Sequence, residues 1–196
     1  MTIAIRPMSG DDVEAVTAVH LTAFPGFFLS FLGARFLRQL YRSLLADEEG
    51  MAFVAADRDR IVGFVAGSGS GAFYRRAARR RWLRFGWASL GALARKPSIA
   101  RRLLRALYAP PKTSSSGALL MSIAVDPAVQ RSGAGKLLTR AFVECARQRG
   151  LVSVVLTTDK VGNDATNAFY RALGFSLASE FVTPEGRAMN EYILYI

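Results

Sequence analysis

The loop at residues 127–136, PAVQRSGAGK, joins a pattern typical of a strand to a pattern typical of a helix. Ala118–Val125 before it is mostly apolar, and Gly135–Arg149 after it carries apolar residues at helical spacing. A helix N-terminus offers backbone N–H groups without intrahelical partners, and glycine lets an anion approach them closely. The loop therefore predicts either an anion site, with phosphate as the usual ligand, or a glycine-rich turn that binds nothing.

The strand-like run Leu151–Thr157 follows that helix, so a strand–helix–strand unit stands at the centre of a mixed α/β order. The remaining patterns predict strands at Thr2–Arg6, Met51–Ala56, Ile61–Ala66, Phe175–Val182 and Ala188–Ile196, and helices ending near Thr22, at Gly33–Ala46 and at Asn163–Leu173. A length of 196 residues suits one domain, 1–196, that carries an inserted segment at about 72–116.

The inserted segment carries almost all of the net charge of +11. Between Arg75 and Lys112 there are twelve basic residues and no acidic one, and the rest of the chain is close to neutral. Tryptophans and leucines alternate with these arginines, which predicts basic amphipathic helices. Three roles fit this pattern: a lid packed on the core, contact with an anionic membrane surface, and, least favoured, binding of nucleic acid.

The chain has one cysteine, Cys145, so no internal disulfide is expected, and its apolar neighbours indicate core packing. No apolar run reaches the length of a membrane span, and the N-terminus lacks the pattern of a secretory signal. The sequence predicts a cytoplasmic protein without a metal site. Peripheral contact with the inner face of the membrane is expected only in the membrane role of the basic segment. Its oligomeric state is left open.

Two common phosphate-binding motifs do not fit the loop. A Walker loop requires glycine where this chain has Gln130 and serine or threonine where it has Leu137. A dinucleotide fingerprint requires glycine at the position of Leu138. The loop is thus either an anion site of another class or a turn that binds nothing.

Two other features resemble the GNAT superfamily of N-acetyltransferases. Gln130-x-x-Gly133-x-Gly135 follows a strand that ends in Val-Asp-Pro, and the stretch from Asn163 through Tyr170 to Gly174-Phe175 is similar to a second element of that superfamily. The resemblance covers residues 118–196 well and 2–67 weakly, and the basic segment lies outside it. It implies a mostly antiparallel central sheet, flanked by helices, with a splay between the fourth and fifth strands and the basic insertion between the third and fourth.

The resemblance also implies that acetyl-CoA lies in that splay as the acyl donor. The backbone of Ile123, Ala124 and Val125 would pair with the pantetheine arm. The pyrophosphate would lie on the loop formed by Gln130, Arg131, Ser132, Gly133, Ala134, Gly135 and Lys136. Asn163 and Asn167 would organise the cofactor and the nearby strand end.

Tyr170 occupies the superfamily position that protonates the departing thiolate, and packing beside Phe169 is the alternative for this residue. The base that deprotonates the amine is harder to find, since many relatives carry a glutamate on the fourth strand and this strand has none. His20 has a suitable intrinsic pKa, although a single helical histidine is usually a packing or capping residue. Ser122, holding a water, and Glu191 are weaker candidates.

The expected activity is acetyl transfer to a primary amine by direct attack. Amino sugars, other small amines and membrane-linked amines are the candidate acceptors, and the amino-sugar hypothesis rests on a loose similarity of residues 24–40 to bacterial members associated with polysaccharide assembly. Because the strand glutamate is missing, a non-catalytic acyl-CoA-binding or interaction module that uses the basic segment remains the alternative.

Overall fold

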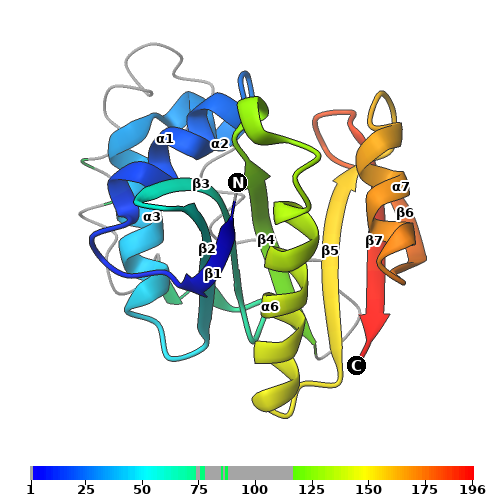
Figure 1. Ribbon diagram of the computed structural model, residues 1–196. Coiled ribbons are helices and arrows are strands. Elements are labelled where there is room, and N and C mark those ends of the chain that lie inside the picture. The colour runs from blue at the N-terminus through cyan, green and yellow to red at the C-terminus, as the bar shows by residue number, and fades with distance from the viewer. Residues whose placement is uncertain (1, 74–75, 78–84, 86, 88–116) are drawn as a thin grey trace.

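The computed structural model of the protein describes residues 2–73, 76–77, 85, 87 and 117–196 (Figure 1). Within these residues seven strands form one sheet in the order β1-β2-β3-β4-β5-β7-β6. Neighbouring strands are antiparallel except β4 and β5, which run parallel. The predicted mixed, mostly antiparallel sheet is confirmed.

The elements follow the predicted order along the chain. They are β1 (Ile3–Pro7), α1 (Val13–Ala23), α2 (Phe28–Leu32), α3 (Ala34–Leu45), β2 (Gly50–Asp57), β3 (Arg60–Ser68), β4 (Ala118–Val125), a 3-10 turn (Pro127–Val129), α6 (Ala134–Gln148), β5 (Ser153–Asp159), α7 (Asp164–Ala172), β6 (Ser176–Val182) and β7 (Ala188–Tyr195). The short helix α2 is missing from the sequence-based prediction, because five residues are too few to establish a helical period.

Helices cover both faces of the sheet, and each face has its own apolar cluster. Helices α1–α3 pack on one face, where Val16 and Leu37 are buried with Phe64 of β3. Helix α6 packs on the other face, where Leu138 and Phe142 are buried with strand residues such as Val154 and Leu156. Figure 1 shows α6 lying along the sheet beside the gap between β4 and β5.

The sheet packs tightly against α6 at Gly67, near the end of β3. A Cβ atom at this position would lie 2.2 Å from the Leu119 carbonyl oxygen and 2.5 Å from the ring of Phe142. Real Cβ atoms do not reach such distances, so a larger residue would force the strand or the helix to move. Glycine at position 67 therefore allows β3, β4 and α6 to pack together.

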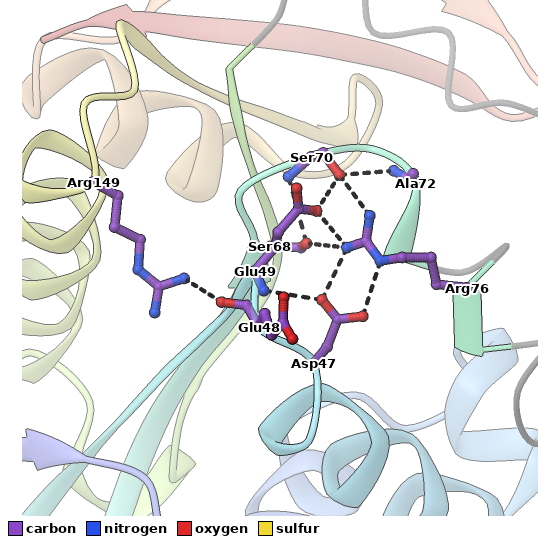
Figure 2. A network of polar contacts seen from close by, with 8 residues as sticks. All are labelled: Asp47, Glu48, Glu49, Ser68, Ser70, Ala72, Arg76 and Arg149. Atoms are coloured by element: carbon purple, nitrogen blue, oxygen red, sulfur yellow. Dashed lines mark hydrogen bonds and ion pairs between the residues drawn. The ribbon is translucent and has the colours of Figure 1, made fainter.

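The inserted segment is fixed at its root by a network of polar contacts (Figure 2). Arg76 donates to both carboxylate oxygens of Asp47, at 3.0 Å and 2.9 Å, and to Ser70 Oγ at 3.0 Å. It also pairs with Glu49 at 2.5 Å. These contacts attach the first residues after β3 to the turn between α3 and β2.

Apolar contacts join the same part of the segment to α3. Phe73, Ala77 and Phe85 are buried in the cluster of α1–α3, and the ring centroid of Phe85 lies 5.3 Å from that of Phe36. Trp87 is exposed. Most of the predicted basic helices, and with them the choice among lid, membrane and nucleic-acid roles, lie outside the described residues. No helix in the described ranges is long and apolar enough to cross a membrane.

We expect Gly67→Ala to lower the free energy of unfolding by about 1–3 kcal/mol, the usual cost of overpacking a core. Gly69→Ala is the matched control two residues away, because a Cβ at position 69 would meet its nearest neighbours at an ordinary 3.6 Å. Urea unfolding of both variants measures the difference. Equal stability of the two variants would contradict the close-packing role of Gly67.

Candidate functional site

The site is built on the separation of β4 from β5. The two parallel strands pair only at Ala118–Val154 and Leu119–Val155, after which β4 continues to Val125 without pairing to β5. The edge of β4 that faces β5 therefore has backbone donors and acceptors with no partner strand among the described residues. An extended ligand could pair with this edge as an additional strand.

A β-bulge determines which side chains of β4 face which helices. Ala66 of β3 is opposite Ser122 and Gly67 is opposite Leu120, so Met121 has no direct partner. Leu120 lies in the α6 cluster, whereas beyond the bulge Ala124 lies in the α1–α3 cluster and Ile123 and Val125 pack against the α6 cluster. The bulge thus re-aims the strand where the gap opens.

The glycine loop lies at the open end of this gap. Asp126 fixes the turn that follows β4, since its carboxylate accepts from Ala128 N–H at 3.0 Å and its own N–H donates to the Val62 carbonyl at 2.8 Å. Arg60 pairs with the same carboxylate. Arg131 and Gly133 adopt left-handed backbone conformations, with φ of 63° and 84°. These constraints give the chain a sharp path from β4 into α6.

Backbone donors are available at the start of α6. The first intrahelical bond recorded there is donated by Leu137 to the Gly133 carbonyl at 3.1 Å, so the N–H groups of Gly135 and Lys136 precede it. Ala134 N–H has only a long contact of 3.4 Å with Ser132 Oγ. Together with the helix dipole, these groups suit an anion.

The structure brings the two sequence motifs together. A Cβ at Gly135 would lie 3.5 Å from the ring of Phe169 on α7 and 3.9 Å from Val125 at the end of β4. The glycine loop, the open end of β4 and α7 therefore meet at one place, although α6 and β5 separate α7 from the loop in the sequence.

Tyr170 lies on α7 and is 5% exposed. Its ring contacts those of Phe169 and Phe175 edge-on, with centroids 5.3 Å and 5.7 Å away. Burial raises the pKa of the Tyr170 hydroxyl above its ordinary value, so the phenol stays protonated at neutral pH but is a weaker acid than an exposed tyrosine. Both predicted roles, acid and packing residue, are compatible with this placement.

Asn163 and Asn167 organise the end of β5. Asn163 Nδ2 donates to Thr158 Oγ1 at 2.7 Å, and Asn167 Nδ2 donates to the Asp159 carbonyl at 2.9 Å. Asn167 Oδ1 accepts from Asn190 Nδ2 at 2.8 Å and from the Tyr192 hydroxyl at 3.1 Å. The amide of Asn167 thus attaches α7 to both β5 and β7, one turn before Tyr170.

His20 lies in the α1–α3 cluster and is 2% exposed. Its Nδ1 is 2.6 Å from the Tyr41 hydroxyl, and its ring stacks on that of Phe64 with an interplanar angle of 18°. Burial lowers the pKa of His20 to about 4, so the imidazole is neutral at physiological pH. This environment favours a packing role, and the catalytic role remains a prediction.

Sequence reasoning missed the carboxylate at the end of β5. Alternate residues of β5 face opposite sides of the sheet, and Val154 and Leu156 face α6, so Thr157 and Asp159 face the side of α1–α3. Glu191 of β7 is directly opposite Thr157 and is buried. The available signal for Asp159 was its position at the carboxyl end of a central strand, where α/β proteins place functional groups.

Comparisons with known proteins agree with this geometry. The family model described as "Acetyltransferase (GNAT) family" matches residues 15–175. A [Ribosomal protein bS18]-alanine N-acetyltransferase of Salmonella typhimurium is 39% identical over 62 residues, which are 32% of this chain and 41% of the relative. This match spans less than half the length of that relative.

Two solved structures share the whole fold. The ribosomal-protein-S18-alanine N-acetyltransferase of Escherichia coli has a TM-score of 0.61 at 18% identity, covering 100% of this chain and 94% of that one. The paia N-acetyltransferase of Thermoplasma acidophilum, in complex with coenzyme A, has a TM-score of 0.61 at 13% identity, covering 97% and 98%. At these identities the similarity establishes the fold alone.

The buried imidazole of His20 predicts a pH dependence of stability. Its pKa is about 4 in the folded state, below the ordinary 6.5, so the unfolded chain takes up a proton first as the pH falls. The free energy of unfolding should therefore decrease by up to about 3 kcal/mol between pH 6.5 and pH 4, and His20 should contribute no further change below that range.

Urea unfolding at several pH values tests this expectation, with His20→Gln as the control because its amide does not titrate. Asp12, whose pKa is about 2, is common to both proteins and titrates at lower pH. The same pH dependence in both proteins would contradict the burial of a neutral His20.

Proposed function

Because the chain belongs to the acetyltransferase (GNAT) family, we propose that it transfers the acetyl group of acetyl-CoA directly to a primary amine. The separation of β4 from β5, with the glycine loop at its open end, is the observation that carries the proposal. A thioester donor needs an extended groove for its pantetheine arm and an anion site for its pyrophosphate, and this arrangement offers both.

Each part of the donor has a proposed partner in the chain. The backbone N–H groups of residues 133–136 bind the pyrophosphate, and Arg131 and Lys136 add positive charge at the rim. The free edge of β4 at Ile123–Val125 pairs with the pantetheine arm. A backbone N–H at Ile123 or Ala124 then donates to the thioester oxygen and stabilises the negative charge that develops on it.

The chemistry is a direct displacement without a covalent enzyme intermediate. The neutral amine attacks the thioester carbon, a tetrahedral intermediate forms, and the carbon–sulfur bond breaks. Tyr170 donates a hydrogen bond to the departing thiolate and passes its proton to it. Because the buried phenol is a weaker acid than the thiol, whose intrinsic pKa is about 8.5, this transfer is completed only when the phenolate is reprotonated. The nitrogen of the tetrahedral intermediate loses one proton as the amide forms, and this proton restores the phenol through water.

The amine arrives as an ammonium ion and must lose a proton before it attacks. Asp159 and Glu191 both lie on the side of the sheet opposite α6, and the carboxylate of Asp159 is held by Arg187. We propose that the proton leaves through water towards Glu191. His20 is less suited to this step, because it is enclosed by aromatic rings.

A panel of amines tests the activity and defines the acceptor. It contains an amino sugar, a polyamine and a peptide with an N-terminal alanine, the last because the Salmonella relative is named for an alanine acceptor. Release of free thiol from acetyl-CoA with at least one amine is expected. Tight CoA binding without thiol release for any amine would favour the non-catalytic acyl-CoA-binding module.

We expect Gly135→Val to abolish CoA binding while the fold is retained, because the added methyl groups would lie between Phe169 and the helix N-terminus. Gly135→Ala is the matched control, since its Cβ would be at an ordinary 3.5 Å from that ring. Calorimetric titration with CoA measures the affinity, and circular dichroism monitors the fold. Unchanged affinity in Gly135→Val would remove the loop from the donor site.

We expect Tyr170→Phe to lower kcat by roughly 10²–10⁴-fold with little change in CoA affinity, because it deletes the proposed acid and keeps the ring. Tyr192→Phe is the control, since it removes a buried hydroxyl that donates to Asn167 at 3.1 Å without touching the proposed acid step. Steady-state kinetics of both variants provide the comparison. Full activity of Tyr170→Phe would leave Tyr170 with a packing role only.

A further inference from the structure

Arg187 connects two parts of the chain that the sheet itself keeps apart. It leaves the turn between β6 and β7, where Thr183 N–H donates to the Arg187 carbonyl at 2.9 Å and Arg187 N–H donates to Thr183 Oγ1 at 3.2 Å. Both contacts fix its backbone, so the direction in which its side chain leaves the turn is restricted.

The guanidinium group of Arg187 binds Asp159 at the carboxyl end of β5. Nε donates to Oδ1 at 3.0 Å, and Nη2 donates to Oδ1 at 2.8 Å and to Oδ2 at 2.6 Å. The side chains are 37% and 25% exposed, respectively. This geometry uses the planar fork of arginine, which the point charge of lysine cannot reproduce.

The same guanidinium group lies over the ring of Phe27, with Cζ 5.6 Å from the ring centroid. Phe27 directly precedes α2 and is 44% exposed. Its ring contacts that of Phe24 at 5.3 Å, and Phe24 contacts His20 at 4.9 Å. The row of rings continues from Arg187 into the buried cluster of α1–α3, so the contact is anchored at both ends.

These contacts occur at the open end of the gap between β4 and β5. Figure 1 shows α1 and α2 beside β4, and β5, β7 and β6 beyond the gap. The proposed donor site uses the start of α6, which packs on one face of the sheet, so an amine must reach the thioester from the face of α1–α3. Asp159 is at the end of β5 on that second face, and Phe27 is in the segment opposite.

We propose that Arg187 is a positioning residue for the amine acceptor. It clamps the segment between α1 and α2 against the carboxyl end of β5 and thereby fixes the width and shape of the opening through which the acceptor enters. This inference rests on the proposed function. Arg187 has no part in the proposed donor site. Loss of the clamp should therefore weaken acceptor binding and leave the affinity for acetyl-CoA unchanged.

Steady-state kinetics with the amine identified in the panel provide the first test. We expect Arg187→Ala to raise the KM for the acceptor roughly tenfold, with kcat and the KM for acetyl-CoA little changed, because the clamp shapes the opening that binds the acceptor and contacts no reacting atom. Arg187→Lys should recover only part of this loss. A fall in kcat with an unchanged acceptor KM would overturn the proposal.

Phe27→Leu and the double variant test whether Arg187 acts through the ring. Since both single variants release the same contact, combining Phe27→Leu with Arg187→Ala should raise the acceptor KM no further than Arg187→Ala alone. Arg147→Ala is the control, because it breaks an exposed ion pair with Glu144 on α6, away from the opening. Additive effects of the two single variants would contradict a shared clamp.

Hydrogen exchange without any substrate separates this inference from the proposed function. Residues 24–32 should exchange faster in Arg187→Ala than in the wild-type protein or in Arg147→Ala, whether or not an acceptor is known. Unchanged exchange in this segment would overturn the clamp even in an active enzyme. A wild-type protein that acetylates no amine, yet shows the faster exchange in the variant, would keep the clamp and refute the acetyl-transfer proposal.

Discussion

The site depends on the short pairing between β4 and β5, which consists of only two residue pairs. At Ala118 and Leu119 the strands are joined to Val154 and Val155, and the parallel ladder then stops while both strands continue. Backbone groups in a sheet interior are normally paired, so an unpaired strand edge has to be occupied by a ligand or water. The glycine loop, α7 and the turn between β6 and β7 all gather around this opening.

The other side of β4 shows how the opening is maintained. β3 follows β4 throughout, but the bulge at Met121 changes which face each later residue presents. Gly67 allows Phe142 of α6 to approach β3 beside that bulge. Strand β4 is therefore tightly packed against β3 and α6 near its start and has no pairing to β5 near its end.

The order of strands and helices, and the position of the anion loop, could be predicted because they rest on local patterns: apolar periodicity, Asp126-Pro127 after a strand, and glycines before a helix. The bulge at Met121 could not, because it depends on the register between two strands. The contact of Arg187 with Asp159 and Phe27 joins segments far apart in sequence, and no local pattern encodes it. The burial of His20 could not be predicted either, because it depends on the packing of α1 against Phe64 of β3.

The ends of the inserted segment lie on neighbouring antiparallel strands. Ser68 at the end of β3 is directly opposite Leu119 at the start of β4, so the sheet needs only a hairpin connection at this point. The entropic cost of closing a loop grows slowly with its length. Chain length beyond the root of the segment therefore costs little at this corner, whereas the root itself, with Phe73 and Phe85 buried against α1–α3, belongs to the core and has to be kept.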